Sequence, residues 1–398
     1  MAPWLAALLA FCLGIAQNVP AQTSVPDGIS LPTELRVQGA GWWPTKSARS
    51  RDEYVGTAEC AKCHADKAAT YQTTAMAHAA SRATASDILH QHNPLNLRIG
   101  QYSYRIETSN EKSVLRISDE KISDEKISDE KSSVSETLLW AFGVGHMGQT
   151  YLYEQNGSFY ESHLSFFSAP QALDITPGQP RSTPRTLEDA GGRRLSPDET
   201  QRCFGCHSTA VTIQEQFDPG KLFPGVTCEG CHGPGASHAA LAHSGSEEPT
   251  PGLILNPARL NRVDAVDFCG ACHRTWEDVV MGGLTGVGVF NVRFAPYRLE
   301  NSKCWKKGDE RITCVACHDP HQPLVRDATS YDSRCLACHV VTADKNKKRT
   351  ASRPGAACPV STSKCVTCHM PAVEPPNLHS VFTDHWIRIV RKGAPYPD

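Results

Sequence analysis

Residues 314–321 read Cys-Val-Ala-Cys-His-Asp-Pro-His, and the first five of them form the pattern that decides how the chain folds. Cys-x-x-Cys followed directly by His occurs seven times in the 398 residues. With 17 His in the chain, a chance follower would be His in about 4% of cases. In chain order, motifs one to seven are Cys60/Cys63/His64, Cys203/Cys206/His207, Cys228/Cys231/His232, Cys269/Cys272/His273, Cys314/Cys317/His318, Cys335/Cys338/His339 and Cys365/Cys368/His369.

The histidine decides between three uses of paired cysteines. Zinc sites and redox dithiols also use Cys-x-x-Cys, but neither requires His at the next position. Cys-x-x-Cys-His is the attachment site of a c-type haem. On one helical turn, residues three and four apart share a face, so two thioethers and an axial imidazole can reach one porphyrin. We therefore predict seven covalent haems c, whose irons are ligated by the seven motif histidines.

The N-terminus predicts export. Residues 1–21 contain the apolar run Trp4 to Ala16 and end in a small-residue site at Ala21, which is typical of a secretory signal peptide. No later stretch approaches the roughly 20 apolar residues of a transmembrane helix, so we expect no transmembrane anchor in the mature chain. We expect a periplasmic or extracellular protein. A basic stripe that would indicate nucleic-acid binding is absent from the sequence.

The composition favours a fold organised around haem. Apolar residues make up 40% of the chain, below the roughly 45–50% usual for globular domains. We therefore expect porphyrins to supply much of the core, in a mainly α fold with extensive loops. The predicted segments are a signal peptide (1–21), an extended lead-in (22–55), a first haem unit (56–95), a small inserted antiparallel β module (96–176), a linker (177–200) and a hexahaem domain (201–398).

The inserted module is predicted from short apolar and β-branched runs. Candidate strands cover residues 102–106, 114–117, 137–142 and 150–153. Gln155-Asn156-Gly157-Ser158 is a strong hairpin signal between two aromatic runs. Ile-Ser-Asp-Glu-Lys occurs three times in residues 117–131, and its period of five matches neither a helix face nor strand alternation. We interpret this repeat as a solvated loop.

Ten histidines remain as candidates for the opposite axial position of each iron. Methionine could serve instead, but bis-His ligation is favoured because the mature chain has few methionines. Local spacing makes His238 and His321 too close to their own motifs to wrap round the same haem, so neighbouring haems are predicted. An alanine-rich helix from residue 65 to about 84 would carry His78 about 21 Å from His64. The predicted distal ligands are His78, His146, His238, His321, His379 and His385, with the acid before His385 as a candidate for orienting its ring. His90, His92, His163 and His243 are weaker candidates.

Two cysteines of the mature chain, Cys304 and Cys358, belong to no motif. An oxidising compartment would favour a disulfide between them. Two buried thiols, or one sulfur near a haem, are the alternatives.

The chain resembles the multihaem cytochromes related to the tetrahaem carrier of hydroxylamine oxidoreductase and, distantly, the pentahaem nitrite reductases. The resemblance rests on residues 54–64, 227–238, 314–321 and 365–371, with His78 and Asp384-His385 downstream. It implies haems packed in parallel and perpendicular pairs, with distal ligands such as His78, His238, His321 and His385 donated from other motifs. The nitrite reductases attach their catalytic haem through a motif that ends in Lys, and this chain has no such motif.

Three functions would use these motifs. The first is an electron-transfer protein that works between redox partners, such as a membrane quinol-oxidising complex or other cytochromes. The second is an enzyme, a reductase or oxidase of small nitrogen or sulfur oxyanions at one five-coordinate haem. The third is a structural subunit of a cytochrome filament or outer-surface complex. Electron transfer is the favoured interpretation because spare histidines could fill every axial position, and no catalytic residue is predicted.

Overall fold

The computed structural model describes residues 50–391, apart from 124–132, 145–146, 214–215, 246–252, 340–357 and 359, together with Gly393 and Tyr396. The predicted signal peptide, nearly all of the lead-in, and His146 lie outside the described residues. No helix in the described ranges has the length and hydropathy needed to cross a bilayer.

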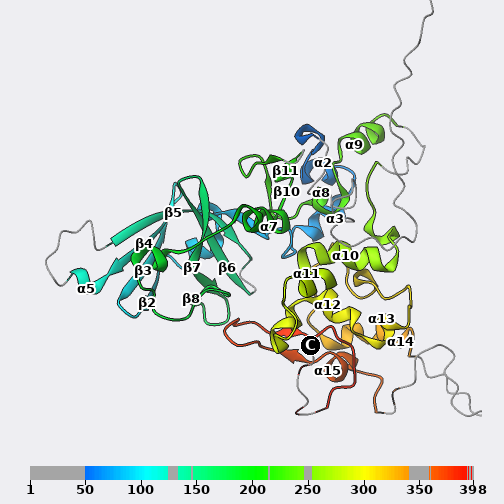
Figure 1. Ribbon diagram of the computed structural model, residues 1–398. Helices are drawn as coiled ribbons and strands as arrows, with labels where there is room; N and C mark the ends of the chain where they lie inside the picture. The colour runs from blue at the N-terminus through cyan, green and yellow to red at the C-terminus, as the bar shows by residue number, and fades with distance from the viewer. Residues whose placement is uncertain are drawn as a thin grey trace, which may run out of the picture.

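An antiparallel sheet of nine strands fills one end of the molecule (Figure 1). Its strands follow the order β2-β3-β4-β5-β6-β7-β8, with β1 paired to β5 and β9 paired to β7. Because β2 and β8 also contact each other, the sheet is nearly closed. The strands are β1 Ala80–Arg82, β2 Leu95–Ile99, β3 Tyr102–Thr108, β4 Ser113–Asp119, β5 Ser133–Phe142, β6 Gly148–Gln155, β7 Ser158–Phe167, β8 Ala172–Ile175 and β9 Gly192–Arg194.

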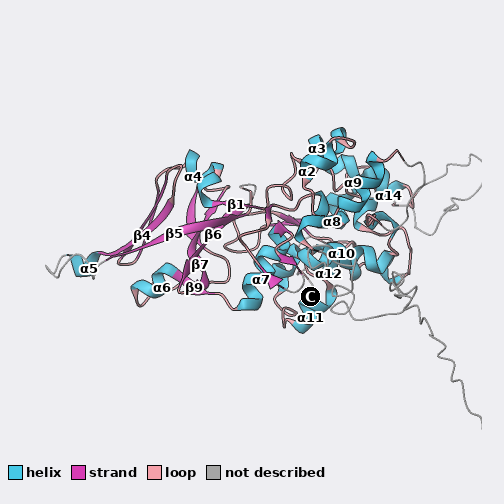
Figure 2. Ribbon diagram, turned by 90° about the horizontal axis from the view of Figure 1, so that it is seen from above, coloured by secondary structure: helices cyan, strands magenta, loops and turns pink. Residues whose placement is uncertain are grey.

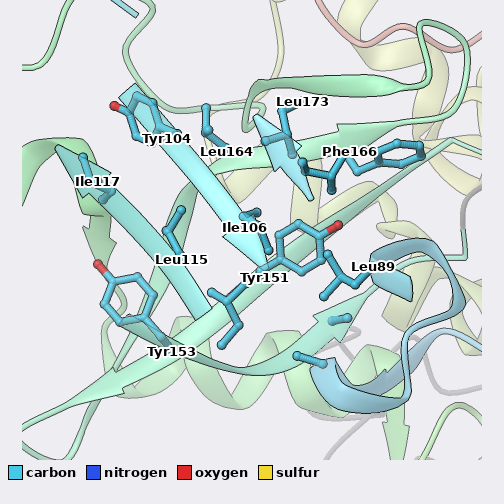
Figure 3. Packing of buried hydrophobic residues seen from close by; sticks show 14 of the residues in the cluster. Leu89, Tyr104, Ile106, Leu115, Ile117, Tyr151, Tyr153, Leu164, Phe166 and Leu173 are labelled. Atoms are coloured by element: carbon cyan, nitrogen blue, oxygen red, sulfur yellow. The ribbon is translucent and has the colours of Figure 1, made fainter. Parts of the chain in front are cut away.

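The sheet has an apolar core of its own. Along β3, Tyr102, Tyr104 and Ile106 point inward while Arg105 and Glu107 alternate with them on the exposed face, as the two-residue period of a strand requires. The inward side chains pack with those of β4, β6, β7 and β8, and Figure 3 shows Leu115 and Tyr151 among them. This part of the chain can therefore bury apolar surface without a porphyrin.

The expectation of a mainly α fold with only a small β module is wrong. Strands from both sides of the predicted insert join the sheet, since β1 precedes it and β9 follows it. The segment 177–200, which the composition favoured as a linker, contains α6 (Leu187–Gly191), β9 and the start of α7 (Pro197–His207). The low apolar fraction of the whole chain had concealed an apolar-rich segment between motifs one and two.

The predicted hairpin is confirmed. β6 and β7 pair from Gln155 opposite Ser158, and the two residues between them, Asn156 and Gly157, have φ of 49° and 71°. Positive φ at both central residues is the geometry of a two-residue hairpin turn.

The predicted helix from residue 65 to about 84 is wrong beyond Tyr71, where α3 (Ala65–Tyr71) ends. The hydroxyls of Thr70 and Thr73 donate to backbone carbonyls near the end of this helix, and such bonds compete with helix continuation. Residues 80–82 then gain a strand ladder with β5. His78 therefore does not sit on a helix that starts at motif one, and the 21 Å estimate for its position fails.

The first copy of the five-residue repeat is not a solvated loop. Ile117 is fully buried in β4 and Asp119 is 4% exposed at its end. Glu120 begins α5 (Glu120–Ser123), and residues 124–132 lie outside the described residues.

Deletion of residues 122–131 is expected to leave the haem absorption spectrum and the stability of the sheet unchanged. Ser118 pairs with Ser133, so four residues would still connect β4 to β5, which is a common hairpin length. As a contrast, Ile117→Ala should lower the free energy of unfolding by about 2–5 kcal/mol because it removes a buried side chain. Both variants are measured by absorbance and denaturant unfolding. Loss of haem from the deletion variant would contradict this expectation.

The other end of the molecule consists of short helices and loops (Figure 2). In the described residues it also has three two-stranded sheets, β10 (Ser208–Thr209) with β13 (Phe223–Pro224), β11 (Thr212–Ile213) with β12 (Gln216–Phe217) and β14 (Ala372–Val373) with β15 (Phe382–Thr383). Two small apolar clusters lie in it, one around Val266 and Trp305 and one around Val279 and Phe294. Helix α4 spans Asp87–Gln91. After α7, the helices are α8 Cys228–His232, α9 Ala236–His243, α10 Arg262–His273, α11 Trp276–Met281, α12 Ala295–Glu300, α13 Lys303–Lys306, α14 Asp332–Leu336 and α15 Cys365–His369. Near the N-terminus, α2 spans Thr57–Ala61.

Candidate functional site

Each motif lies on or at the end of a short helical element. Motifs two and four occupy the last turns of α7 and α10, which begin at capping residues Ser196 and Asn261. Motifs three and seven form α8 and α15 themselves. Motif one starts on α2, motif five on the 3₁₀ helix Cys314–Ala316, and motif six on α14. This placement puts the cysteines and histidine of a motif on one local turn, as haem attachment requires.

The motifs differ in how deeply the polypeptide buries them. Six motif residues are exposed: Cys63 and His64 of motif one, His273 of motif four, Cys317 of motif five, His339 of motif six and Cys368 of motif seven. The helices α2, α14 and α15, at motifs one, six and seven, contain no buried residue. By contrast, α7 and α10 bury Phe204 and Phe268.

Cys63, His339 and Cys368 lie on or just after these three helices. Because these helices bury no side chain, the polypeptide alone does not enclose the three residues. Their predicted roles in haem attachment and iron ligation rest on the motif pattern alone and stay predictions.

Three motif histidines have one ring nitrogen tied to the backbone. The Nδ1 atoms of His207, His232 and His369 lie 2.9, 2.7 and 2.9 Å from the carbonyl oxygens of Ala79, Leu255 and Arg388. A carbonyl can only accept, so Nδ1 carries the proton in each bond and Nε2 is left with its lone pair. This is the tautomer that binds iron through Nε2.

Three other histidine rings face motif histidines. His238 lies opposite His64 with ring centroids 6.4 Å apart and planes 14° apart. His321 lies opposite His232 at 6.0 Å and 11°. His385 lies opposite His318 at 6.2 Å and 45°. In each pair the two histidines belong to different parts of the chain.

These separations fit a haem iron between the rings. A metal–imidazole bond is about 2 Å long, so two rings on opposite sides of one iron have centroids roughly 6 Å apart. Direct stacking of two rings would bring their centroids closer than that spacing, and the three pairs instead leave room for one coordinated atom. At each of these three sites, two thiols that can attach a porphyrin and two imidazoles that can bind its iron match a covalent bis-His haem.

Burial keeps several of these rings neutral, which is the form that binds a metal. Burial lowers the pKa of the motif histidines His207, His232 and His318. It also lowers the pKa of His385 to about 4. At neutral pH these imidazoles therefore have lone pairs available.

The remaining candidate ligands contact other groups. Nε2 of His78 lies 2.6 Å from the Gln72 carbonyl oxygen, and Nε2 of His379 lies 2.7 Å from a carboxylate oxygen of Asp174. The weaker candidates behave similarly: His90 bonds the Thr84 carbonyl, His92 packs on Phe166, His163 bonds Gln179 and His243 bonds Glu59. The structure therefore does not place His78 or His379 opposite a motif histidine.

An ion-pair cluster that the sequence did not predict lies beside His385. Asp384 and Arg298 are both fully buried and joined by two bonds of 2.8 Å, and Arg388 donates to Asp384 at 2.6 Å. Burial raises the pKa of Asp384, but hydrogen bonds from Arg298, Trp386 and Arg388 bring it below its ordinary value. Asp384 does not orient the His385 ring as expected, because Nδ1 of His385 contacts the Thr383 carbonyl at 2.9 Å.

Neighbouring motifs touch through their cysteines. Cys206 Sγ lies 3.6 Å from the Ala271 carbonyl, and Cys272 Sγ lies 3.8 Å from the Cys206 carbonyl, so motifs two and four are in contact. Pairs of thiols within hydrogen-bonding reach join motif one to three, four to five and six to seven, through Cys60 with Cys228, Cys269 with Cys314 and Cys335 with Cys365.

The two cysteines outside the motifs, Cys304 and Cys358, are both free thiols in this structure. Cys304 is half-buried near Cys338 of motif six, and burial raises the pKa of its thiol. The predicted disulfide is therefore not formed here.

Comparison with known proteins gives one family and one solved structure. Residues 178–233, which contain motifs two and three, match the family of cytochrome c554 and c-prime. This match supports a c-type cytochrome, which holds haem covalently. The crystal structure of the outer cell wall cytochrome OcwA is similar over 85% of this chain and 80% of its own, with 14% identity and a TM-score of 0.47. No curated protein matches the chain.

Proposed function

We propose that this chain is an exported electron-transfer cytochrome that binds one haem at each of its seven motifs. The observation that carries the proposal is the set of three histidine pairs, each spaced for one iron and each joining two parts of the chain. Haem c supplies a reversible Fe(III)/Fe(II) couple when it is bound. Bis-His ligation leaves the iron no open position, which suits transfer of electrons without binding of a substrate.

The histidine pairs support three distal ligands. His238 completes the site of motif one, His321 that of motif three and His385 that of motif five. Each distal histidine lies a few residues after a motif or in the C-terminal segment, so one part of the chain holds an iron bound by another. This cross-connection keeps neighbouring sites at fixed separations.

The contacts between motifs support an order in space. Motif one contacts motif three, motif four contacts two and five, and motif six contacts seven. The Cys231 and Cys269 side chains are near enough to interact electrostatically, as are those of Cys317 and Cys335, which joins motif three to four and five to six. The proposed order is therefore one, three, four, five, six and seven, with motif two branching from four.

This order implies more than one place for electrons to enter and leave. Motifs one, two and seven are the three ends of the branched series, and redox partners are expected to dock near them. Of the three exposed motif thiols, Cys63 and Cys368 belong to two of these ends, and Cys317 belongs to motif five. The partners that fit are a membrane quinol-oxidising complex or other cytochromes, in the periplasm or outside the cell.

Carbon monoxide binding separates a carrier from a reductase. The reduced holoprotein is expected to bind no carbon monoxide and the oxidised protein to have a low-spin spectrum, because bis-His ligation at each of the seven haems would leave no open axial position. Absorbance before and after addition of the gas measures this, with a His/Met or bis-His carrier cytochrome as control. Carbon monoxide binding together with turnover of nitrite or hydroxylamine would replace the carrier with the reductase alternative.

A further inference from the structure

Glu229 is a buried acid inside motif three. This residue is 1% exposed and lies between Cys228 and Gly230 on α8. Acidic residues are seldom fully buried unless their charge is compensated. Here the carboxylate accepts three backbone N–H groups: Oε1 accepts from Val55 at 2.9 Å and from Gly235 at 2.8 Å, and Oε2 accepts from Gly56 at 2.8 Å.

The three donors lie at the N-terminal ends of α2, which ends three residues before His64, and of α9, which carries His238. Gly56 is the N-cap of α2, which holds Cys60 just before His64. Gly235 is the N-cap of α9, which carries His238. A single carboxylate therefore fixes the start of both elements, and their His64 and His238 rings lie 6.4 Å apart.

The surroundings leave this carboxylate little freedom. A Cβ added at Gly235 would lie 3.3 Å from Oε1 of Glu229 and 3.2 Å from the Val55 side chain. Gly56 has φ of 81°, a conformation that favours glycine. The backbone at both N-caps is thus shaped to point its N–H groups at the acid.

We propose that Glu229 is the positioning residue for the axial ligands of motif one, acting from within motif three. The carboxylate holds α2 and α9 at the spacing that lets His64 and His238 bind the same iron. This inference rests on the proposed function, because it assumes that His238 is a ligand. It adds that a residue of motif three sets the axial ligation of the haem at motif one.

A second acid provides a matched control. Glu59 on α2 bonds Nε2 of His243 on α9 at 2.8 Å, so it also bridges the same two helices. Its side chain is only partly buried, at 23% exposure, and its partner is the exposed His243 side chain. Glu59→Gln and Glu229→Gln remove the same charge from the same neighbourhood, but only the second disturbs the N-cap bonds.

The experiment compares the spin state and the carbon monoxide binding of four variants: Glu229→Gln, Glu59→Gln, His238→Ala and the Glu229→Gln/His238→Ala double variant. Each is measured as holoprotein, and its haem content is checked by intact mass. A glutamine can offer one oxygen but turns an NH₂ group toward at least one backbone N–H, so one bond is lost. Glu229→Gln should raise the high-spin population and carbon monoxide binding at one haem of seven. Glu59→Gln should stay low-spin, and the double variant should equal His238→Ala.

Each outcome decides a different claim. If His238→Ala stays low-spin, His238 is not a ligand, and both the ligand assignment and this inference fail. If His238→Ala becomes high-spin while Glu229→Gln stays low-spin and excludes carbon monoxide, the positioning role is overturned and the ligand assignment stands. If Glu229→Gln does not incorporate haem, Gly235→Ala takes its place, because its Cβ would press on Oε1. Full low-spin character in that variant would overturn the inference.

Discussion

His238→Ala, His321→Ala and His385→Ala are each expected to convert one of seven irons from low spin to high spin. The reason is the same in each variant, because the motif histidine and the two thioethers remain while the ring on the opposite side is removed. The covalent haem content should therefore be unchanged. Electron paramagnetic resonance of the oxidised protein and carbon monoxide binding to the reduced protein measure the effect as one new site per chain.

His243→Ala is the matched control for His238→Ala. Both residues lie on α9, and the His243 ring bonds Glu59 instead of facing a motif histidine. His243→Ala should leave the spectrum low-spin. A low-spin spectrum in any of the three ligand variants would show that the corresponding pair does not share an iron.

Asp384→Ala is expected to lower the free energy of unfolding of the holoprotein by about 3–5 kcal/mol. The variant leaves the fully buried Arg298 guanidinium without the carboxylate that it contacts twice, and an uncompensated buried charge is costly. The loss should extend to haem ligation, because Arg388 also contacts Asp384 and its carbonyl orients His369. Denaturant unfolding, followed by absorbance, measures the change.

Asp309→Ala provides the control for a paired acid. Asp309 also makes two bonds to an arginine, Arg311, but that pair is solvent-exposed, and exposed ion pairs contribute little. Asp309→Ala should therefore leave the unfolding curve nearly unchanged. If Asp384→Ala is as stable as the wild type, the buried cluster does not hold this part of the fold together.

Local patterns in the sequence predicted what depends on local geometry. The seven motifs have the spacing needed for haem attachment, and Asn156-Gly157 predicted the turn that the structure contains. The helix predicted through His78 failed because the Thr70 and Thr73 hydroxyls bond backbone carbonyls and residues 80–82 pair with β5. The helix propensity of the residues takes account of neither the hydroxyl bonds nor the strand pairing.

Burial of the motifs could not be predicted from their spacing. The same five-residue pattern gives the buried surroundings of His207 on α7 and the exposed side chains of Cys63, His339 and Cys368. The difference comes from which other elements pack against each motif, and the sheet covers α7 through residues such as Trp140.

Contacts between distant residues were beyond sequence reasoning. The bond from Val55 to Glu229 joins residues 174 apart, and the Arg298–Asp384 pair joins residues 86 apart. No pattern of spacing marks such a pair in one sequence. Sequence reasoning proposed His238, His321 and His385 as distal ligands. It did not predict which motif histidine each of these rings faces.

The most direct test of the central claim is an anaerobic redox titration of the mature holoprotein, with electrons counted per chain. Seven covalent haems predict uptake of seven electrons, reversed completely on reoxidation, with the absorbance of low-spin haem rising through the whole titration. Uptake of fewer than seven electrons by fully matured protein would contradict one haem at each motif.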